Sequence, residues 1–220
     1  MLDLLLPQRC IVCSVPGGQV CAACTSALRR IARPACACCG APTAWPVARC
    51  LECAGRRLAF VRARAAVEYD APVRRIVTAW KERGLRRLAA WAAAVVADSL
   101  PPPDTDCLTF IAADPDRRLK RGHHPAEALA RELSRTWGIG LEPCLVRIRG
   151  SPRQRRLTRI ERRHNVAAAF ASTGRAPARV TLVDDVYTTG STANAAASAL
   201  REAGASKVEI VTFARTIRIR

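Results

Sequence analysis

Cysteine pairs constrain the first part of this 220-residue chain more than any other feature does. Nine of the 11 cysteines fall between Cys10 and Cys53, in a stretch that is rich in proline and glycine and poor in apolar periodicity. Such a stretch buries too little core to fold without an added staple. Eight of these cysteines form four pairs with two residues between the partners: Cys10/Cys13, Cys21/Cys24, Cys36/Cys39 and Cys50/Cys53.

The spacing of these pairs is typical of zinc ligands. Two intervening residues let a tight turn aim both sulfurs at one ion, and two such turns complete the four-thiolate set that Zn²⁺ prefers. We therefore predict two structural zinc ions, each binding with on the order of 10 kcal/mol, and all eight paired cysteines as metal ligands. The spacing leaves open which pairs share an ion. A redox dithiol or simple packing is the alternative, and the remaining cysteines are expected to be packing residues: Cys38, Cys107 and Cys144.

Charge and hydropathy limit the setting in which the chain acts. The start, MLDLLLPQRC, has a short apolar run and an acidic residue where a signal peptide carries basic ones. No stretch reaches the ~20 apolar residues of a membrane span, so we expect a cytoplasmic protein, where reduced thiols favour metal over disulfides. The excess of 36 Lys and Arg over 18 Asp and Glu favours polyanionic partners such as nucleic acid, a phosphorylated ligand or an acidic membrane surface. A solvated basic surface explains the same charge.

Beyond residue 56, apolar periodicity alternates between the strand and helix types. The predicted strands are residues 60–69, 107–113, 141–148, 179–183 and 207–213. The predicted helices are one that Asp70 opens and Gly84 interrupts, then residues 85–100, 125–137 and 191–203. This alternation predicts an α/β fold with a mostly parallel sheet and helices on both faces. We therefore expect two domains, a Cys-rich one at 1–56 and an α/β one at 57–220.

Residues 180–192, VTLVDDVYTTGST, place two acids and a hydroxyl-rich loop after a buried strand. Ligands of open parallel sheets lie at the carboxyl ends of the strands, where Asp184 and Asp185 are expected. The free N–H groups and positive dipole of the helix that follows suit a phosphate. We expect the acids to accept hydrogen bonds from a sugar diol or to help hold Mg²⁺, while the loop binds the phosphate. A plain turn and helix cap is the alternative, and neither a Walker motif nor a dinucleotide-binding glycine pattern is present.

The same thirteen residues resemble the phosphoribosyl diphosphate (PRPP) motif of type I phosphoribosyltransferases. Together with the cysteine pairs and three further segments, the chain resembles the ComF/GntX-type competence proteins over most of its length. Those segments are YDAPVRRIVTAWKERG, RRLKRGHHPAEALA and RQRRLTRIERRHNVAAAF. The resemblance implies a type I phosphoribosyltransferase-like fold behind a double zinc ribbon, PRPP bound with Mg²⁺, and a link to DNA uptake.

The resemblance also implies roles by position. Asp184 and Asp185 would hold the ribose 2′ and 3′ hydroxyls and act as the catalytic residues. The 5′-phosphate would bind to Thr188, Thr189, Gly190, Ser191 and Thr192. The pyrophosphate side would use basic residues: Lys81, Arg117, Arg118, Arg121, Arg153 and Arg162. The chain departs from the family at IAAD (111–114), where VPVP is common, and at RGHHP (121–125), where RGFNQ is common.

Two functions follow from these observations. The first is an enzyme, a phosphoribosyltransferase acting on an unidentified acceptor. The second is a non-catalytic adaptor that binds single-stranded DNA through the zinc ribbons and the eight arginines of residues 147–163, with PRPP as a ligand or regulator and DNA-uptake proteins as partners. A protein-assembly module built on the zinc-binding turns is a third, weaker hypothesis. Surface or capping roles are expected for His123, His124 and His164, with His124 on the pocket floor as the alternative.

Overall fold

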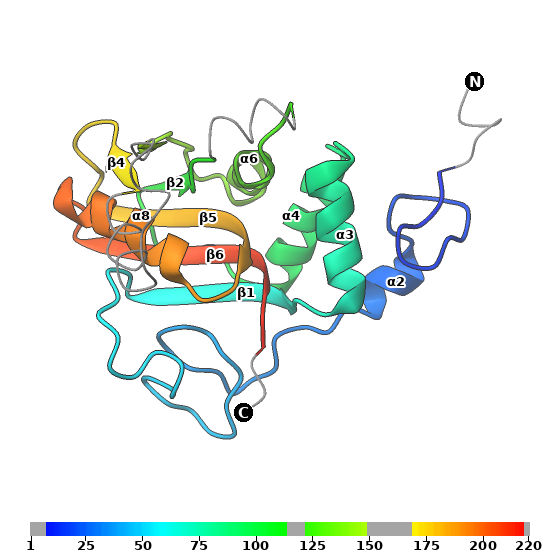
Figure 1. Ribbon diagram of the computed structural model, residues 1–220, viewed down its shortest axis with the longest axis horizontal. Helices are drawn as coiled ribbons and strands as arrows, with labels where there is room; N and C mark the ends of the chain where they lie inside the picture. Colours follow the sequence, from blue (N-terminus) through cyan, green and yellow to red (C-terminus); the bar gives the residue numbers. More distant parts are fainter. Residues whose placement is uncertain (1–7, 114–121, 149–168, 218–220) are drawn as a thin grey trace, which may run out of the picture.

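Four parallel strands form the centre of the molecule (Figure 1). The structure is a computed structural model that describes residues 8–113, 122–148 and 169–217. The strands are β1 (Arg62–Glu68), β2 (Cys107–Phe110), β5 (Arg179–Tyr187) and β6 (Lys207–Arg215). They lie in the order β1-β6-β5-β2, and every pairing is parallel. The predicted α/β fold with a mostly parallel sheet is therefore confirmed.

Helices cover both faces of this sheet. Successive residues of a strand point to opposite faces, and Leu182 and Val183 of β5 accordingly enter two different cores. The core around Val183 is formed with α3 (Ala71–Glu82), α4 (Leu88–Ser99) and α6 (Pro125–Trp137). The core around Leu182 is formed with α8 (Ser191–Glu202), which lies in front of β5 and β6 in Figure 1.

Local signals explain where these helices begin and end. The Asp70 side chain accepts a hydrogen bond from the Val73 N–H at 3.1 Å and so caps α3. The apolar residues of α3 at helical spacing, including Ile76 and Trp80, are buried against the sheet. At the end of α6, Gly138 has a φ of 68°, the left-handed conformation that a glycine adopts readily. All four predicted helices are present.

Three strands differ by three or more residues at one end from their predicted extents. β2 ends at Phe110 rather than at residue 113, and β5 continues through the two acids to Tyr187. The predicted strand 141–148 is reduced to β3 (Leu145–Arg147), which pairs outside the main sheet. Its partner is antiparallel β4 (Phe170–Ser172), which the sequence analysis did not predict. Pro143 has no N–H to donate, so the chain before β3 makes only an isolated bridge to β2.

The cysteine-rich segment divides into two parts that contact different elements (Figure 1). The first zinc ribbon, residues 10–24, contains the start of α2 (Ala22–Ser26) and lies beside α3. The second zinc ribbon, residues 36–53, lies near the end of β6. Between them the chain follows the outer edge of β1, where the Ile31 N–H donates to Ala66 O at 3.1 Å. The expected domain boundary at residue 56 stays a prediction.

Candidate functional site

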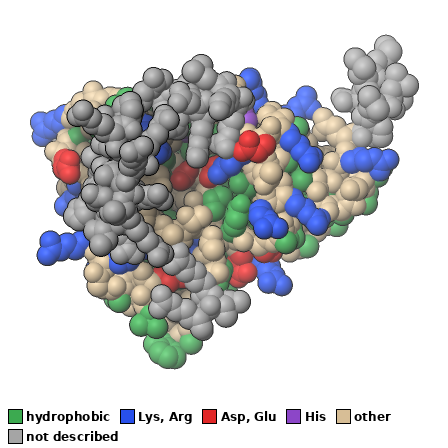
Figure 2. Space-filling model, viewed as in Figure 1, with side chains coloured by type: hydrophobic (Ala, Val, Ile, Leu, Met, Phe, Trp, Pro, Cys, Tyr) green, Lys and Arg blue, Asp and Glu red, His purple; other side chains and the backbone are tan. Residues whose placement is uncertain are grey.

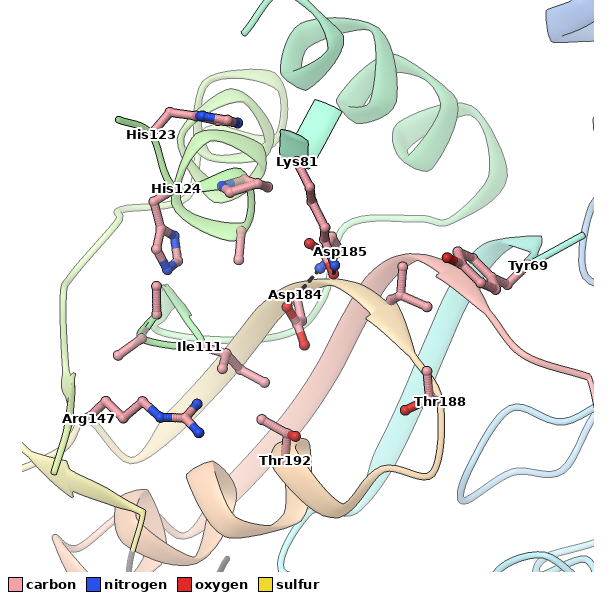
Figure 3. A pocket seen from close by; sticks show the side chains of 15 residues that line it. Tyr69, Lys81, Ile111, His123, His124, Arg147, Asp184, Asp185, Thr188 and Thr192 are labelled. Carbon is pink, nitrogen blue, oxygen red and sulfur yellow. Dashed lines mark hydrogen bonds and ion pairs between the residues drawn. The ribbon is translucent and has the colours of Figure 1, made fainter. Parts of the chain in front are cut away.

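A cleft of about 440 Å³ opens at the carboxyl ends of the parallel strands (Figure 3). The strand ends contribute Tyr69 after β1, Ile111 after β2, and both acids from β5. Lys81 enters from the end of α3, and His124 from the start of α6. Open parallel sheets bind their ligands at this position because loops and helix termini converge there.

The unequal lengths of β2 and β5 explain why both acids reach the cleft. β2 pairs with β5 only as far as Phe110 and Val183, and the Ile111 N–H makes the last bond, to Val183 O at 3.0 Å. β5 continues along β6, where Asp184 lies opposite Thr212. The departure of β2 therefore leaves the edge of β5 at the acid pair open to the cleft.

The two carboxylates lie in different electrostatic surroundings. Lys81 Nζ lies 2.8 Å from Asp185 Oδ1, and the Asp185 side chain is only 10% exposed. Burial and the adjacent Asp185 charge raise the pKa of Asp184 to about 8, although the Asp185 N–H, which donates to Asp184 Oδ1 at 2.9 Å, acts in the opposite direction. Among the described residues, Lys81 is the cation that acts on both acids. The pair is therefore suited to hydroxyl donors or to a divalent cation.

Residues 188–192, which we name the phosphate loop, form the other wall of the cleft. Four of them expose hydroxyl-bearing side chains, and the Thr189 and Ser191 hydroxyl oxygens lie 2.9 Å apart. α8 begins directly after Gly190, whose position at the N-cap supplies no capping side chain, and the Ser191 N–H donates to the Thr189 hydroxyl oxygen at 3.3 Å. The amide N–H groups that follow Ser191 in the first turn, and the positive dipole of this twelve-residue helix, are therefore suited to an anion. A second hollow of about 30 Å³ lies within the loop.

The phosphate loop is supported from behind by Tyr187 and by the chain next to the second zinc ribbon. Gly190 has a φ of 72°, and a Cβ there would lie 2.5 Å from Tyr187 Cζ. The Arg56 guanidinium donates to Thr189 O at 2.8 Å. The Ala59 N–H donates to the Asn194 side-chain oxygen at 2.8 Å, which fixes the first turn of α8. The loop is thus held in one shape by contacts far away in sequence.

Of the basic residues predicted for the pyrophosphate side, one lies in the cleft and the others lie outside the described part of the chain. Lys81 lies in the cleft, as described, whereas the five arginines predicted for the pyrophosphate side lie outside the described residues: Arg117, Arg118, Arg121, Arg153 and Arg162. Of the basic segment 147–163, Arg147 lines the cleft. Its guanidinium also lies 5.3 Å from the centre of the Phe170 ring.

The sequence left open whether His124 caps a helix or lines the pocket, and in the structure it does both. The Glu127 N–H donates to His124 Nδ1 at 2.9 Å, so His124 caps α6 while its ring also lines the cleft. His123 lines the cleft as well, and its Nε2–H donates to Trp80 O at 2.7 Å. Tyr69 and Ile111 also line the cleft and were not predicted, since only their positions after strands β1 and β2 distinguish them in the sequence. His164 lies outside the described residues.

The cysteine pairs form two groups of four. Cys10, Cys13, Cys21 and Cys24 make one group, and Cys36, Cys39, Cys50 and Cys53 make the other. Within each group all sulfurs lie within 4.8 Å of one another, as four ligands of one ion require. Backbone N–H groups also donate to sulfur, for example from Cys50 to Cys36 Sγ at 3.2 Å. Neighbouring pairs therefore share an ion, and the two groups are structural zinc sites.

Comparison with known proteins agrees with this architecture. The family model described as a double zinc ribbon domain matches residues 1–55. "Competence protein F" of Haemophilus influenzae is 38% identical over 104 residues, which is 45% of each chain. "DNA utilization protein YhgH" of Salmonella typhi is 26% identical over 97% of this chain and 100% of that protein. The chain is similar to proteins of the ComF type. The match spans less than half of the length of the Haemophilus relative.

Hydropathy and surface charge add two further observations. None of the helices in the described part has both the length and the hydropathy needed to cross a membrane. On the face in Figure 2, Lys and Arg side chains are spread over several elements and do not merge into one patch. The net charge of +18 therefore includes a general basic surface, and specific anion sites must be argued from individual groups.

Proposed function

We propose that the cleft binds PRPP with Mg²⁺ and transfers its phosphoribosyl group to an acceptor. One observation carries this proposal: the cleft and the small hollow inside the phosphate loop share Asp184, Thr188 and Thr192 in their walls. A carboxylate pair and an anion-binding helix start thus meet at one place. This is the arrangement that a sugar diol linked to a phosphate needs.

Each group has a distinct task in the proposed reaction. Asp184 and Asp185 accept hydrogen bonds from the ribose hydroxyls, and the phosphate loop binds the 5′-phosphate through N–H and O–H donors. Lys81 holds Asp185 in place and adds positive charge near the leaving pyrophosphate. Mg²⁺, when bound, supplies further charge neutralisation for the pyrophosphate oxygens. The bond from ribose C1 to pyrophosphate breaks while a bond from C1 to the acceptor forms.

Calorimetric titration with PRPP and Mg²⁺ tests binding directly. We expect the double variant Asp184→Asn/Asp185→Asn to lose at least tenfold in affinity, because hydrogen bonds to charged groups contribute about 1.5–3 kcal/mol each. Asp104→Asn is the matched control, since that carboxylate is 69% exposed and pairs with Arg179 away from the cleft. Equal affinity of wild type and double variant contradicts the proposal. Release of pyrophosphate on addition of candidate acceptors then separates turnover from binding.

A second candidate function is binding of single-stranded DNA. A groove of about 590 Å³ lies between β1 and the chain that joins the two zinc ribbons. Four arginines line it: Arg30, Arg33, Arg62 and Arg64. The Arg64 side chain is only 12% exposed, and its Nη2 lies 3.8 Å from the Glu209 carboxylate. Its Nε and Nη2 atoms make no hydrogen bond within the described part of the chain. Burial lowers the pKa of Arg64, and Arg62 and Arg64 share the single Glu209 carboxylate, so the excess positive charge of the groove favours an anionic ligand such as a phosphate.

The names of the relatives support the same setting. Proteins called competence protein F and DNA utilization protein are similar to this chain, so we propose a role in handling DNA during uptake. DNA-uptake proteins are the partners that this role implies, and PRPP acts as a ligand or regulator if transfer does not occur. A cytoplasmic location stays a prediction.

Fluorescence anisotropy with a labelled oligonucleotide, repeated over a salt series, tests the DNA proposal. For single strands each neutralised phosphate contributes about −0.7 to the slope of log K against log salt. We expect Arg33→Ala/Arg62→Ala to make this slope shallower by roughly two phosphates, or about 1.4. Arg135→Ala, an exposed position on α6 paired with Glu132, is the control and leaves the slope unchanged. An equal loss in both variants means that the groove is not the binding surface.

A further inference from the structure

A third group of metal-ligating side chains lies at the opposite end of the sheet from the cleft. Cys107 is the first residue of β2, and Cys144 directly precedes β3. Together with Glu142 they place two sulfurs and a carboxylate oxygen within 4.8 Å of one another. The cleft lies at the carboxyl ends of the strands, whereas this group lies at the amino end of β2. It therefore takes no part in the proposed binding of PRPP and does not depend on it.

Hydrogen bonds fix the chain on both sides of this group. The Leu108 N–H donates to Gly140 O at 2.8 Å, and the Glu142 N–H donates to Leu108 O at 2.9 Å. The Cys144 N–H donates to the Thr109 hydroxyl at 3.1 Å. These bonds run along β2 and hold residues 140–144 against it. The three ligand atoms therefore meet without any rearrangement of the backbone.

The burial of the three side chains differs in a way that suits a metal. Cys107 is 1% exposed and Cys144 is 7% exposed, whereas Glu142 lies at the surface. Among the described residues no cation pairs with the Glu142 carboxylate; the nearby Arg179 pairs with Asp106 and Asp104.

We propose that Cys107, Glu142 and Cys144 form a third metal site, for Zn²⁺ or a similarly soft divalent ion. Two thiolates and one carboxylate are a ligand set that Zn²⁺ accepts, and its tetrahedral preference leaves a fourth position beside the exposed Glu142. The two ribbon sites are closed by four sulfurs, whereas this site keeps one position for water. We therefore expect the ion here to exchange faster and to bind more weakly than the two ribbon ions.

Zinc stoichiometry of the full-length protein tests this proposal. The protein is equilibrated with excess Zn²⁺ and a reductant, and the ions per chain are counted by native mass spectrometry while a competing chelator is added. We expect three ions in the wild type, of which one leaves first. Cys107→Ala/Cys144→Ala binds two ions over the whole titration, and Glu142→Gln loses its third ion at a lower chelator concentration than the wild type does.

Cys38→Ala is the matched control, because Cys38 belongs to none of the three groups and its variant is expected to keep three ions. Glu142 is exposed, so Glu142→Gln keeps the test valid even if the double cysteine variant does not fold. Two ions in the wild type at excess Zn²⁺ overturn the proposal. So does a third ion that the cysteine and glutamate substitutions do not weaken, or a Cys107–Cys144 disulfide that forms in the zinc-loaded protein without reductant.

Discussion

Replacing Gly190 by alanine tests whether contact with Tyr187 fixes the shape of the phosphate loop. Gly190 has a φ of 72°, a conformation that costs a residue with a side chain about 1–2 kcal/mol. The added Cβ would also lie 2.5 Å from Tyr187 Cζ and 3.0 Å from Cε2. The ring cannot move away freely, because it packs edge-on against Phe60 and beneath the Arg215 guanidinium. Forcing a methyl group into a packed site costs a further ~1–3 kcal/mol.

The two costs sum to a loss of about 2–5 kcal/mol in the free energy of unfolding, measured by urea denaturation. Two other glycines separate these costs. Gly138 has a φ of 68° but has no atom within 4 Å of an added Cβ, so Gly138→Ala reports the backbone cost alone. Gly174 has neither constraint, and Gly174→Ala is expected to stay within ~0.5 kcal/mol of the wild type. If Gly190→Ala costs no more than Gly138→Ala, the contact with Tyr187 does not constrain the loop.

Four other perturbations have defined outcomes. Lys81→Gln removes the cation 2.8 Å from Asp185, and we expect about a tenfold loss of PRPP affinity by calorimetry, since a charged hydrogen bond contributes ~1.5–3 kcal/mol. The pKa of Asp184 is raised to about 8 in the folded protein, so its contribution to stability falls as pH rises from the ordinary aspartate pKa towards 8. Asp184→Asn removes this dependence, and urea unfolding at the two ends of that range should show a larger gain in stability at the higher pH. Tyr187→Phe removes a buried hydroxyl that has no hydrogen-bond partner in the described chain, so urea unfolding should show unchanged or slightly higher stability. Removal of zinc with a strong chelator should raise hydrogen–deuterium exchange across residues 188–192, because the chain next to the second zinc ribbon holds this loop; unchanged exchange contradicts that dependence.

The sheet and its helices were predictable because each element carries its own periodic pattern. The limits of β5 were not, since two aspartates are unfavourable in a strand and suggested that it ended at Val183. In the structure the pairing of β5 with β6 continues through Asp184 to Tyr187, because β6 extends equally far. The end of β5 is thus set by its pairing with β6, and the residue pattern of β5 alone does not show how far that pairing extends.

In the candidate site, too, residues that are contiguous in sequence were predictable, whereas residues that the fold brings together were not. The acids and the phosphate loop are contiguous in sequence, so one motif predicted both. Tyr69 and Ile111 reach the cleft only because the strand order brings the ends of β1 and β2 together with the end of β5. The pairing of cysteines into two zinc sites likewise depended on where the chain runs between Cys24 and Cys36. That path follows the edge of β1 and separates the two ribbons.

One buried cation connects the second zinc ribbon to the phosphate loop. Arg215 ends β6 and is 1% exposed, so its charge must be satisfied inside the protein. The ribbon supplies the partners: the guanidinium donates to Cys39 O and to the Glu52 carboxylate, the latter at 3.0 Å. The same guanidinium lies 5.3 Å from the centre of the Tyr187 ring, which supports Gly190. Loss of the ribbon fold would leave this charge buried without its partners directly beneath the loop. We therefore expect zinc binding in the second ribbon to affect the shape of the proposed phosphate site, although none of the described residues that line this site is a zinc ligand.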